Sequence, residues 1–293
     1  MLRVSFRTNL IAYLFMAPFL LGFLAFLVGP LVYALVLSLF RESMIGATRF
    51  VGFANYLQVV QDAKFWEGIW NMLVFGVILV PFLLVLSLII ALLLDSHYPR
   101  AKGFFRIAIF LPYAIPGVIA AVIWGYLYGP VFGPITQLAQ LLNIPAPPLL
   151  SDTLILFTLA NIVVWELVGY KMIIVFSALQ NVSPELEEAA VLDGASDWQY
   201  AWHIKVPLVG AAMMLNAIFA IIGTLQLFNE PSIIKTMAPA VISNHFTPNM
   251  YARSLSFIGQ QINYAAALSF LLGLVVALLS LMVVLAARWR RTV

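Results

Sequence analysis

The sequence predicts an all-α integral membrane protein with six transmembrane helices. The 293 residues are 63% hydrophobic and only 9% charged, whereas soluble domains carry about 25% charged residues. Several apolar runs reach the roughly 20 residues that a helix needs to cross a bilayer. The most charged segment, Ser183–Pro207, lies between two of those runs and holds five of the twelve carboxylates. We therefore expect a single transmembrane domain, residues 1–293, with one polar loop that has a role other than crossing the membrane.

The six predicted spans differ in length and in their helix-breaking residues. The first follows Arg7 and is far longer than the apolar core of a signal peptide, so we expect it to be retained. It is also too long for one straight crossing, and Pro18 and Pro30 predict a bend or a start along the interface. In the third span, Pro112 and Pro116 predict kinks. The predicted spans are Leu10–Phe40, Ile69–Leu94, Phe104–Tyr128, Thr153–Ala178, Leu208–Phe228 and Tyr264–Ala287.

Lysine and arginine predict that both termini are cytoplasmic. Six crossings place the termini on the same side of the membrane, and basic residues concentrate in cytoplasmic segments. With the termini inside, the inner segments hold nine Lys and Arg and the outer segments hold five. The turn Arg100–Arg106 and the tail Arg288–Arg291 supply most of this bias. Trp124 and Tyr128 would then belong to an outer aromatic belt, and Ser183–Pro207 would be cytoplasmic.

The charged segment has the signals of a short helix, a tight turn and a second short helix. Ser183, followed by proline and then by an acid in the first turn, is typical of a helix start. Gly194 suits the end of this first helix. Ser196 and Gln199 form a capping box for the second helix, which should run to about Val206. The segment could be a rigid docking element, or an interfacial loop whose tryptophans lie among lipid headgroups.

The spacing within this segment resembles the EAA loop in the permease subunits of ABC importers. The sequence has Glu188-Ala189-Ala190, then Gly194 after three residues, Ile204 after nine more and Pro207 after a further two. Asp193-Gly194-Ala195 resembles the form found in the carbohydrate-uptake branch of that family. Apolar segments elsewhere are also similar to spans of that branch, so the resemblance covers a core permease region of about residues 69–293.

The resemblance implies a permease subunit of an ATP-driven ABC importer that translocates a sugar, such as a di- or oligosaccharide, across the cytoplasmic membrane. In that family this loop docks on a cytoplasmic ATPase, which makes Ser183–Pro207 the predicted coupling loop. The implied partners are a second related permease, two ABC ATPase subunits that bind ATP and Mg²⁺, an extracytoplasmic solute-binding protein, the sugar and membrane lipid. The residues implied in ATPase coupling are Glu188, Ala189, Ala190, Asp193, Gly194, Ala195, Ile204 and Pro207.

Polar side chains in the fourth and fifth spans are candidates for a substrate path. At 100° per residue, Asn216, Gln226 and Glu230 fall within about 80° of one another and form a stripe towards the outer mouth. Amides, carboxylates and aromatic rings suit the hydroxyls and C–H faces of a neutral sugar. They could instead join this subunit to a partner helix, and Lys171 is expected to snorkel to the interface. The candidates are Asn161, Trp165, Glu166, Tyr170, Asn216, Gln226, Asn229 and Glu230.

The sequence gives no support for catalysis by this chain. It lacks a phosphate-binding G-x-x-x-x-G-K-[ST] motif, and its three histidines stand in separate loops without metal-ligand spacing. We therefore expect no cofactor or metal in this chain. Two alternatives remain: an ABC permease for another polar solute such as a glycerol phosphate, and a secondary carrier in which Glu166 and Glu230 relay protons. Six spans without an inverted repeat are few for a carrier.

Overall fold

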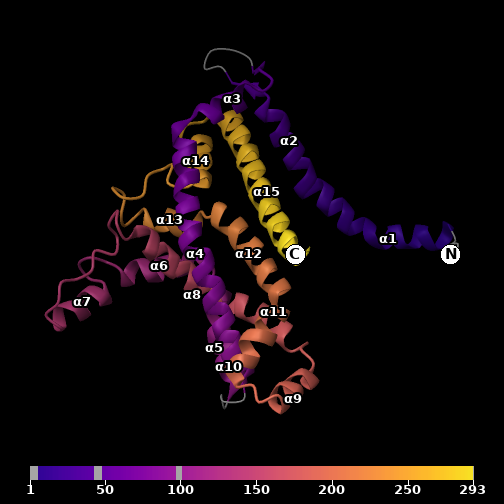
Figure 1. Cartoon of the computed structure of the whole chain (residues 1–293). Helices are drawn as coiled ribbons and strands as arrows, with labels where there is room; N and C mark the ends of the chain where they lie inside the picture. Colours follow the sequence, from indigo (N-terminus) through magenta and orange to yellow (C-terminus); the bar gives the residue numbers. More distant parts are fainter. Residues whose placement is uncertain (1–5, 43–47, 97–100, 293) are drawn as a thin grey trace. The chain divides into compact units, whose positions relative to one another are not determined.

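The computed structural model describes residues 6–42, 48–96 and 101–292, and helices form most of this part of the chain (Figure 1). Contacts divide the chain into two compact units, Met1–Phe65 with Ala252–Gly273, and Trp66–Tyr251 with Leu274–Val293. Three helices contribute residues to both units: α4 (Ala63–Asp95), α14 (Pro248–Arg253) and α15 (Ile262–Thr292). Arg3 and Arg100, which contribute to the predicted orientation, lie outside the described residues.

The first unit contains the N-terminal span. Its helix runs from α1 (Phe6–Phe23) through the π-helical segment η1 (Leu24–Val28) into α2 (Gly29–Ser38). Figure 1 shows the ribbon curving between α2 and α1, so the bend predicted from the two prolines is spread over a continuous helix.

Side-chain amides hold the C-terminal end of α2. Asn55 Nδ2 donates to the carbonyl oxygen of Ser38 at 2.8 Å, and Asn263 Nδ2 donates to that of Leu37 at 2.9 Å. These bonds satisfy carbonyl groups that a helix end leaves without partners. The unit also contains the antiparallel pair β1 (Phe40–Arg41) and β2 (Arg49–Phe50), α3 (Ala54–Gln61) and η4 (Ser254–Ile258).

The second unit is organised around α8 (Ile155–Leu179), the most buried of the described spans. α5 (Lys102–Phe110) crosses α8 at Gly169, where an added Cβ would stand 2.7 Å from the Cα of Phe110. Glycine therefore permits the close approach of these two backbones. α13 (Asn229–Ile234) packs against both α6 (Gly117–Leu127) and α8. The other elements are η2 (Leu111–Ala114), α7 (Pro134–Leu141), α9 (Pro184–Leu192), α10 (Asp197–Tyr200), η3 (Ala201–Lys205), α11 (Val206–Leu208) and α12 (Gly210–Leu225).

The spans agree with the predicted six-helix membrane fold. Five described helical stretches are long and apolar enough to cross a bilayer: Tyr13–Ser38, Ala63–Asp95, Ile155–Leu179, Gly210–Ile234 and Ile262–Leu285. The sixth apolar segment is a bent pair, Lys102–Ala114 with Gly117–Leu127. If this pair is counted as one broken span, the described residues contain six candidate membrane spans.

The third span is more sharply broken than the kinks expected in Phe104–Tyr128, because its two parts differ in direction by 96°. The helix stops after Ala114, and Ile115 is extended with φ −84° and ψ 126°. A residue that precedes proline avoids the helical region, so Pro116 imposes this conformation on Ile115. Pro116 then serves as the N-cap of α6.

The fifth span is also interrupted, and this corrects the predicted polar stripe. α12 ends at Leu225, and α13 begins at Asn229. Pro231, in the first turn of α13, has no N–H to donate, and in a continuous helix its ring would clash with the carbonyl of Leu227. The stripe assumed one uninterrupted helix. Gln226 is still the C-cap of α12, but Glu230 lies beyond the break and does not continue the helical face of Asn216.

Candidate functional site

The first helix of the segment Ser183–Pro207 is closed at both ends as the sequence predicted. The Ser183 side chain accepts a hydrogen bond from the backbone N–H of Glu185, and proline opens α9. At the other end Gly194 has φ +76°. The N–H of Gly194 donates to the carbonyl of Val191 at 3.0 Å, and that of Ala195 donates to the carbonyl of Ala190 at 2.9 Å. This pair of bonds is a Schellman motif, which fixes the direction in which the chain leaves α9.

The second helix begins with the predicted capping box. The Gln199 side chain accepts from the Ser196 N–H at 2.8 Å, and the Ser196 hydroxyl accepts from the Gln199 N–H at 3.4 Å. The helical path continues through α10, the π-helical η3 and α11, which contains Pro207. The exposed rings of Trp198 and Trp202 stack with centroids 5.9 Å apart on this helix.

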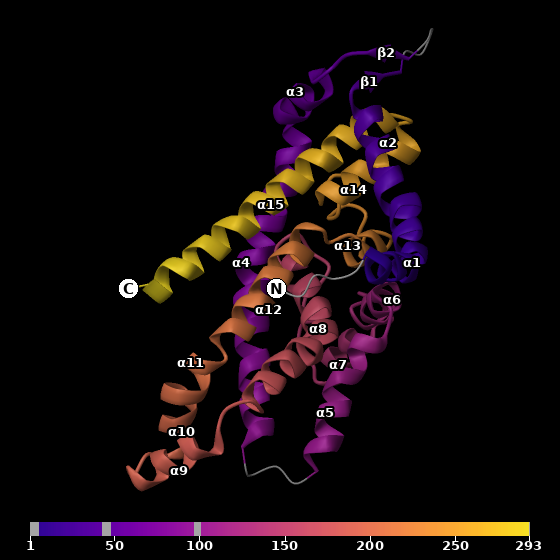
Figure 2. The same cartoon turned by 90° about the vertical axis from the view of Figure 1, so that its right-hand side faces the viewer.

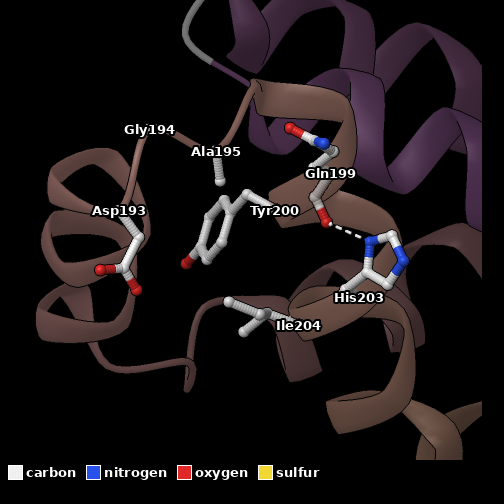
Figure 3. A pocket seen from close by; sticks show the side chains of 7 residues that line it. All are labelled: Asp193, Gly194, Ala195, Gln199, Tyr200, His203 and Ile204. Carbon is white, nitrogen blue, oxygen red and sulfur yellow. Dashed lines mark hydrogen bonds between the residues drawn. The ribbon is translucent and has the colours of Figure 1, made fainter.

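A groove of about 300 Å³ lies between the two helices (Figure 3). Figure 3 shows the Tyr200 ring between the turn and the side chain of Ile204, while Asp193 faces the space from the end of α9. Four of the eight predicted coupling residues line the groove: Asp193, Gly194, Ala195 and Ile204. Of the other four, Glu188, Ala189 and Pro207 are exposed and Ala190 is buried.

Tyr200 is a groove residue absent from the predicted coupling set. It is 7% exposed, and burial raises the pKa of its hydroxyl above the ordinary value. Lys205 opposes this rise in pKa, whereas Glu187 and Asp95 add to it. The phenol is therefore neutral at physiological pH and lines the groove. Its place directly after Gln199, in the helix that the capping box opens, is the signal in the sequence that could have identified it.

The polar and aromatic residues of α8 mostly contact the third span. Asn161 Nδ2 donates to the Tyr128 hydroxyl at 2.7 Å. The Trp165 ring meets the Trp124 ring edge to face with centroids 5.7 Å apart. Tyr170 stacks on Tyr113 at 4.5 Å. These three candidates therefore hold parts of this chain together.

Asn216 and Lys171 form a reciprocal pair between α12 and α8. Asn216 Nδ2 donates to the Lys171 carbonyl at 3.0 Å, and Lys171 Nζ donates to the Asn216 carbonyl at 3.3 Å. Lys171 is only 3% exposed, so the prediction that it snorkels to the interface is wrong. The carbonyl oxygen of Asn216 and the faces of Tyr170 and Phe219 surround the ammonium group instead.

Glu166 and Glu230 meet at one cavity. Both line a space of about 150 Å³ together with Gly223 and Thr224. A Cβ on Gly117, the first residue of α6, would stand 3.2 Å from Glu166 Oε1 and 2.7 Å from Glu230 Oε1. Two carboxylates from different helices thus converge on one glycine. The candidates Gln226 and Asn229 are exposed and do not belong to the lining of this cavity.

Comparisons with known proteins identify the family. Residues 84–291 match the family described as binding-protein-dependent transport system inner membrane component. The lactose transport system permease protein LacF of Rhizobium radiobacter is 31% identical over 285 residues, which cover 95% of this chain and 94% of LacF. The arabinooligosaccharides transport system permease protein AraP of Bacillus subtilis (strain 168) is 26% identical, with 92% of this chain and 86% of AraP covered.

The fold has a close counterpart among solved structures. A chain in the crystal structure of a bacterial ABC transporter involved in the import of the acidic polysaccharide alginate superposes with a TM-score of 0.84. The match covers 96% of both chains at 19% identity, so it establishes the shared fold alone. The match over residues 84–291 and the 31% identity to LacF over 95% of this chain show that the chain belongs to the family of binding-protein-dependent transport system inner membrane components.

Proposed function

We propose that this chain is a permease subunit of an ATP-driven ABC importer for a neutral di- or oligosaccharide. Its membership of the family carries the proposal, because that family comprises membrane components of binding-protein-dependent transport systems. The names of LacF and AraP refer to lactose and arabinooligosaccharides, which supports a sugar. The partners would be a second permease, two ATPase subunits and an extracytoplasmic binding protein, and both termini would be cytoplasmic.

The geometry of Ser183–Pro207 supports a role in coupling to the ATPase. Two capped helices joined by a Schellman turn form a stiff element. An ideal Cβ on Gly194 meets no described atom within 4 Å, so the turn is open to the backbone of another protein. Leu192, 88% exposed, and Trp198, 71% exposed, add apolar surface beside the turn, as expected for a contact with a protein partner. ATP would bind and be hydrolysed on that partner.

The converging carboxylates favour a neutral solute over a glycerol phosphate. Carboxyl oxygens accept hydrogen bonds from sugar hydroxyls, whereas the described residues that line this cavity include no lysine or arginine to pair with a phosphate group. The cavity of about 150 Å³ is smaller than the roughly 300–1,000 Å³ of most ligand pockets. A second permease would therefore contribute the rest of the path. The same carboxylates also suit the alternative of a proton-coupled carrier, so the source of energy must be measured.

Purification of the chain under its own affinity tag tests the proposal. We expect a second permease and an ATPase chain to copurify, and we expect ATP hydrolysis to increase when binding protein and lactose or arabinotriose are added. Glycerol 3-phosphate should give no increase. A tagged chain that purifies without any ATPase, or a complex stimulated only by glycerol 3-phosphate, would contradict the proposal.

The carboxylates can be tested in the same complex. Glu230→Ala should reduce sugar uptake while the complex stays assembled, and Glu230→Gln should retain more uptake because its amide oxygen still accepts hydrogen bonds. Asp152→Ala, which removes an exposed carboxylate from the loop before α8, is the matched control. Normal uptake by Glu230→Ala would exclude this residue from the path.

A further inference from the structure

Asp95, the last residue of α4, lies where three parts of the chain meet. Its Oδ2 is 2.5 Å from Nζ of Lys205, at the end of the coupling loop. Its Oδ1 accepts a hydrogen bond from Nε2 of Gln180, just after α8, at 2.8 Å. Each carboxylate oxygen therefore contacts a different segment. Lys102 approaches the same residue but donates to its backbone carbonyl, at 3.4 Å.

The pair of Asp95 and Lys205 is shielded from solvent. The side chains are 10% and 13% exposed. The ammonium of Lys205 lies 4.9 Å from the centroid of the Tyr200 ring, and that ring is itself a wall of the groove in the loop. Removal of either partner from a shielded pair leaves an uncompensated charge in a poorly solvated place, so the loss costs more than it does in an exposed pair.

An apolar cluster underlies this contact and joins the same segments. It contains Leu94 of α4, Leu179 of α8 and Val209, which follows the coupling loop. By contrast, α9 has Ala190 as its single buried residue. The loop is therefore attached to the spans through its second helix, while the first helix projects. Figure 2 shows α9 and α10 beyond the end of α12, next to the end of α4.

We propose that Asp95 is a positioning residue that fixes the coupling loop to the inner ends of α4 and α8. This inference rests on the proposed function of Ser183–Pro207 as the coupling loop. Asp95 does not contact the ATPase in this account. It holds Lys205, and through Lys205 the second helix and the groove, so that movement of the loop also moves two spans. Without this contact, the ATPase would still dock on the loop, but the apolar cluster alone would hold the loop against α4 and α8, and less of its movement would reach these spans.

Three variants test the inference in the tagged complex reconstituted with binding protein and lactose. Asp95→Asn removes the charge and keeps an oxygen for Gln180, Lys205→Gln removes the other charge, and the double variant Asp95→Lys/Lys205→Asp reverses the pair. Lys102→Gln is the matched control, because the side chain of this neighbouring lysine donates to the Asp95 backbone and not to its carboxylate. The readouts are copurification of the ATPase and the amount of lactose imported per ATP hydrolysed.

We expect both single variants to retain the ATPase and to import about fivefold less lactose per ATP, a typical size for the loss of one coupling contact. The reversed pair should recover most of the ratio, and Lys102→Gln should match the parent. Unchanged ratios in the single variants, or no recovery in the reversed pair, would overturn the inference. A further variant, Lys205→Arg, keeps the charge. If both single variants fail to insert while Lys205→Arg inserts normally, the pair is a folding contact and the inference is also overturned. Absence of the ATPase from the parent complex would instead contradict the proposed function.

Discussion

Gly194→Asp separates two reasons for a glycine at the turn of the coupling loop. One is the left-handed backbone conformation of the turn, and the other is the close approach of a partner protein. The residue has φ +76°, and an added Cβ would meet no described atom of this chain within 4 Å. Within the chain the cost is therefore confined to backbone conformation. A side chain in the left-handed region costs about 1 kcal/mol, and less for Asp or Asn than for most residues.

The magnitude of this cost limits what strain alone can do. A change of about 1 kcal/mol shifts an equilibrium roughly fivefold, which is small against the stability of a six-helix bundle. If the turn packs closely against the ATPase, a larger side chain at position 194 has no space to occupy. It must then push the loop and the ATPase apart. We therefore expect Gly194→Asp to insert and to pair with its partner permease, and to lose sugar-stimulated ATP hydrolysis by more than about tenfold.

The assay is ATP hydrolysis by the reconstituted complex with binding protein and sugar, beside copurification of the ATPase. Gly52→Asp is a matched control, because Gly52 also has a positive φ, +56°, and open space for a Cβ among the described residues. Gly194→Asn distinguishes bulk from added charge. Full coupling in Gly194→Asp, or an equal loss in Gly52→Asp, would refute the reasoning.

Two other predictions concern the fold and its orientation. Gly169→Ala should sharply reduce the amount of folded protein in a thermal-unfolding assay. Its Cβ would stand 2.7 Å from the Cα of Phe110, so the two backbones would have to separate. Gly273→Ala is the control and should fold normally, because an added Cβ there meets no described atom within 4 Å. The chain has no cysteine, so single cysteines at Asn143 and Ser196, both exposed, report the side of the membrane. An impermeant thiol reagent outside intact cells should label Asn143→Cys and leave Ser196→Cys unlabelled; the opposite pattern would reverse the orientation.

Local chemistry made the loop predictable from the sequence. Ser183, Gly194, Ser196 and Gln199 each act on backbone groups within a few residues of themselves. Caps and turns of this kind depend on short-range hydrogen bonds, so the sequence alone specifies them. The positions of the spans followed from length and hydrophobicity in the same way.

The breaks in two spans were harder to predict, although both have a local cause. Pro116 stands inside a long apolar run, where proline is often tolerated because neighbouring groups satisfy the backbone. Pro231 follows Asn229 and Glu230, just beyond the predicted end of the fifth span at Phe228. Whether such a proline causes a kink or a break of 96° depends on how the two parts pack. α13 packs against α6 and α8. The hydrophobic periodicity of one segment cannot predict such contacts between helices.

Contacts between distant segments were beyond the reach of the sequence. Asp95 and Lys205 are 110 positions apart, and neither belongs to a recognisable spacing. Glu166 and Glu230 were each identified as polar residues in spans, but their convergence on Gly117 depends on the bend before α6. The assignment of residues 1–293 to a single domain and the roles of the coupling residues stay predictions.

Dependence of uptake on ATP tests the central claim most directly. Vesicles that contain the complex separate the two sources of energy. They hold ATP on the side of Ser183–Pro207, and on the other side the binding protein with a labelled sugar that stimulates ATP hydrolysis. An ABC importer subunit should support uptake that stops without ATP, stops with a non-hydrolysable analogue and continues when ionophores collapse all ion gradients. Uptake that proceeds without ATP and disappears with the ion gradient would contradict the account and favour a secondary carrier.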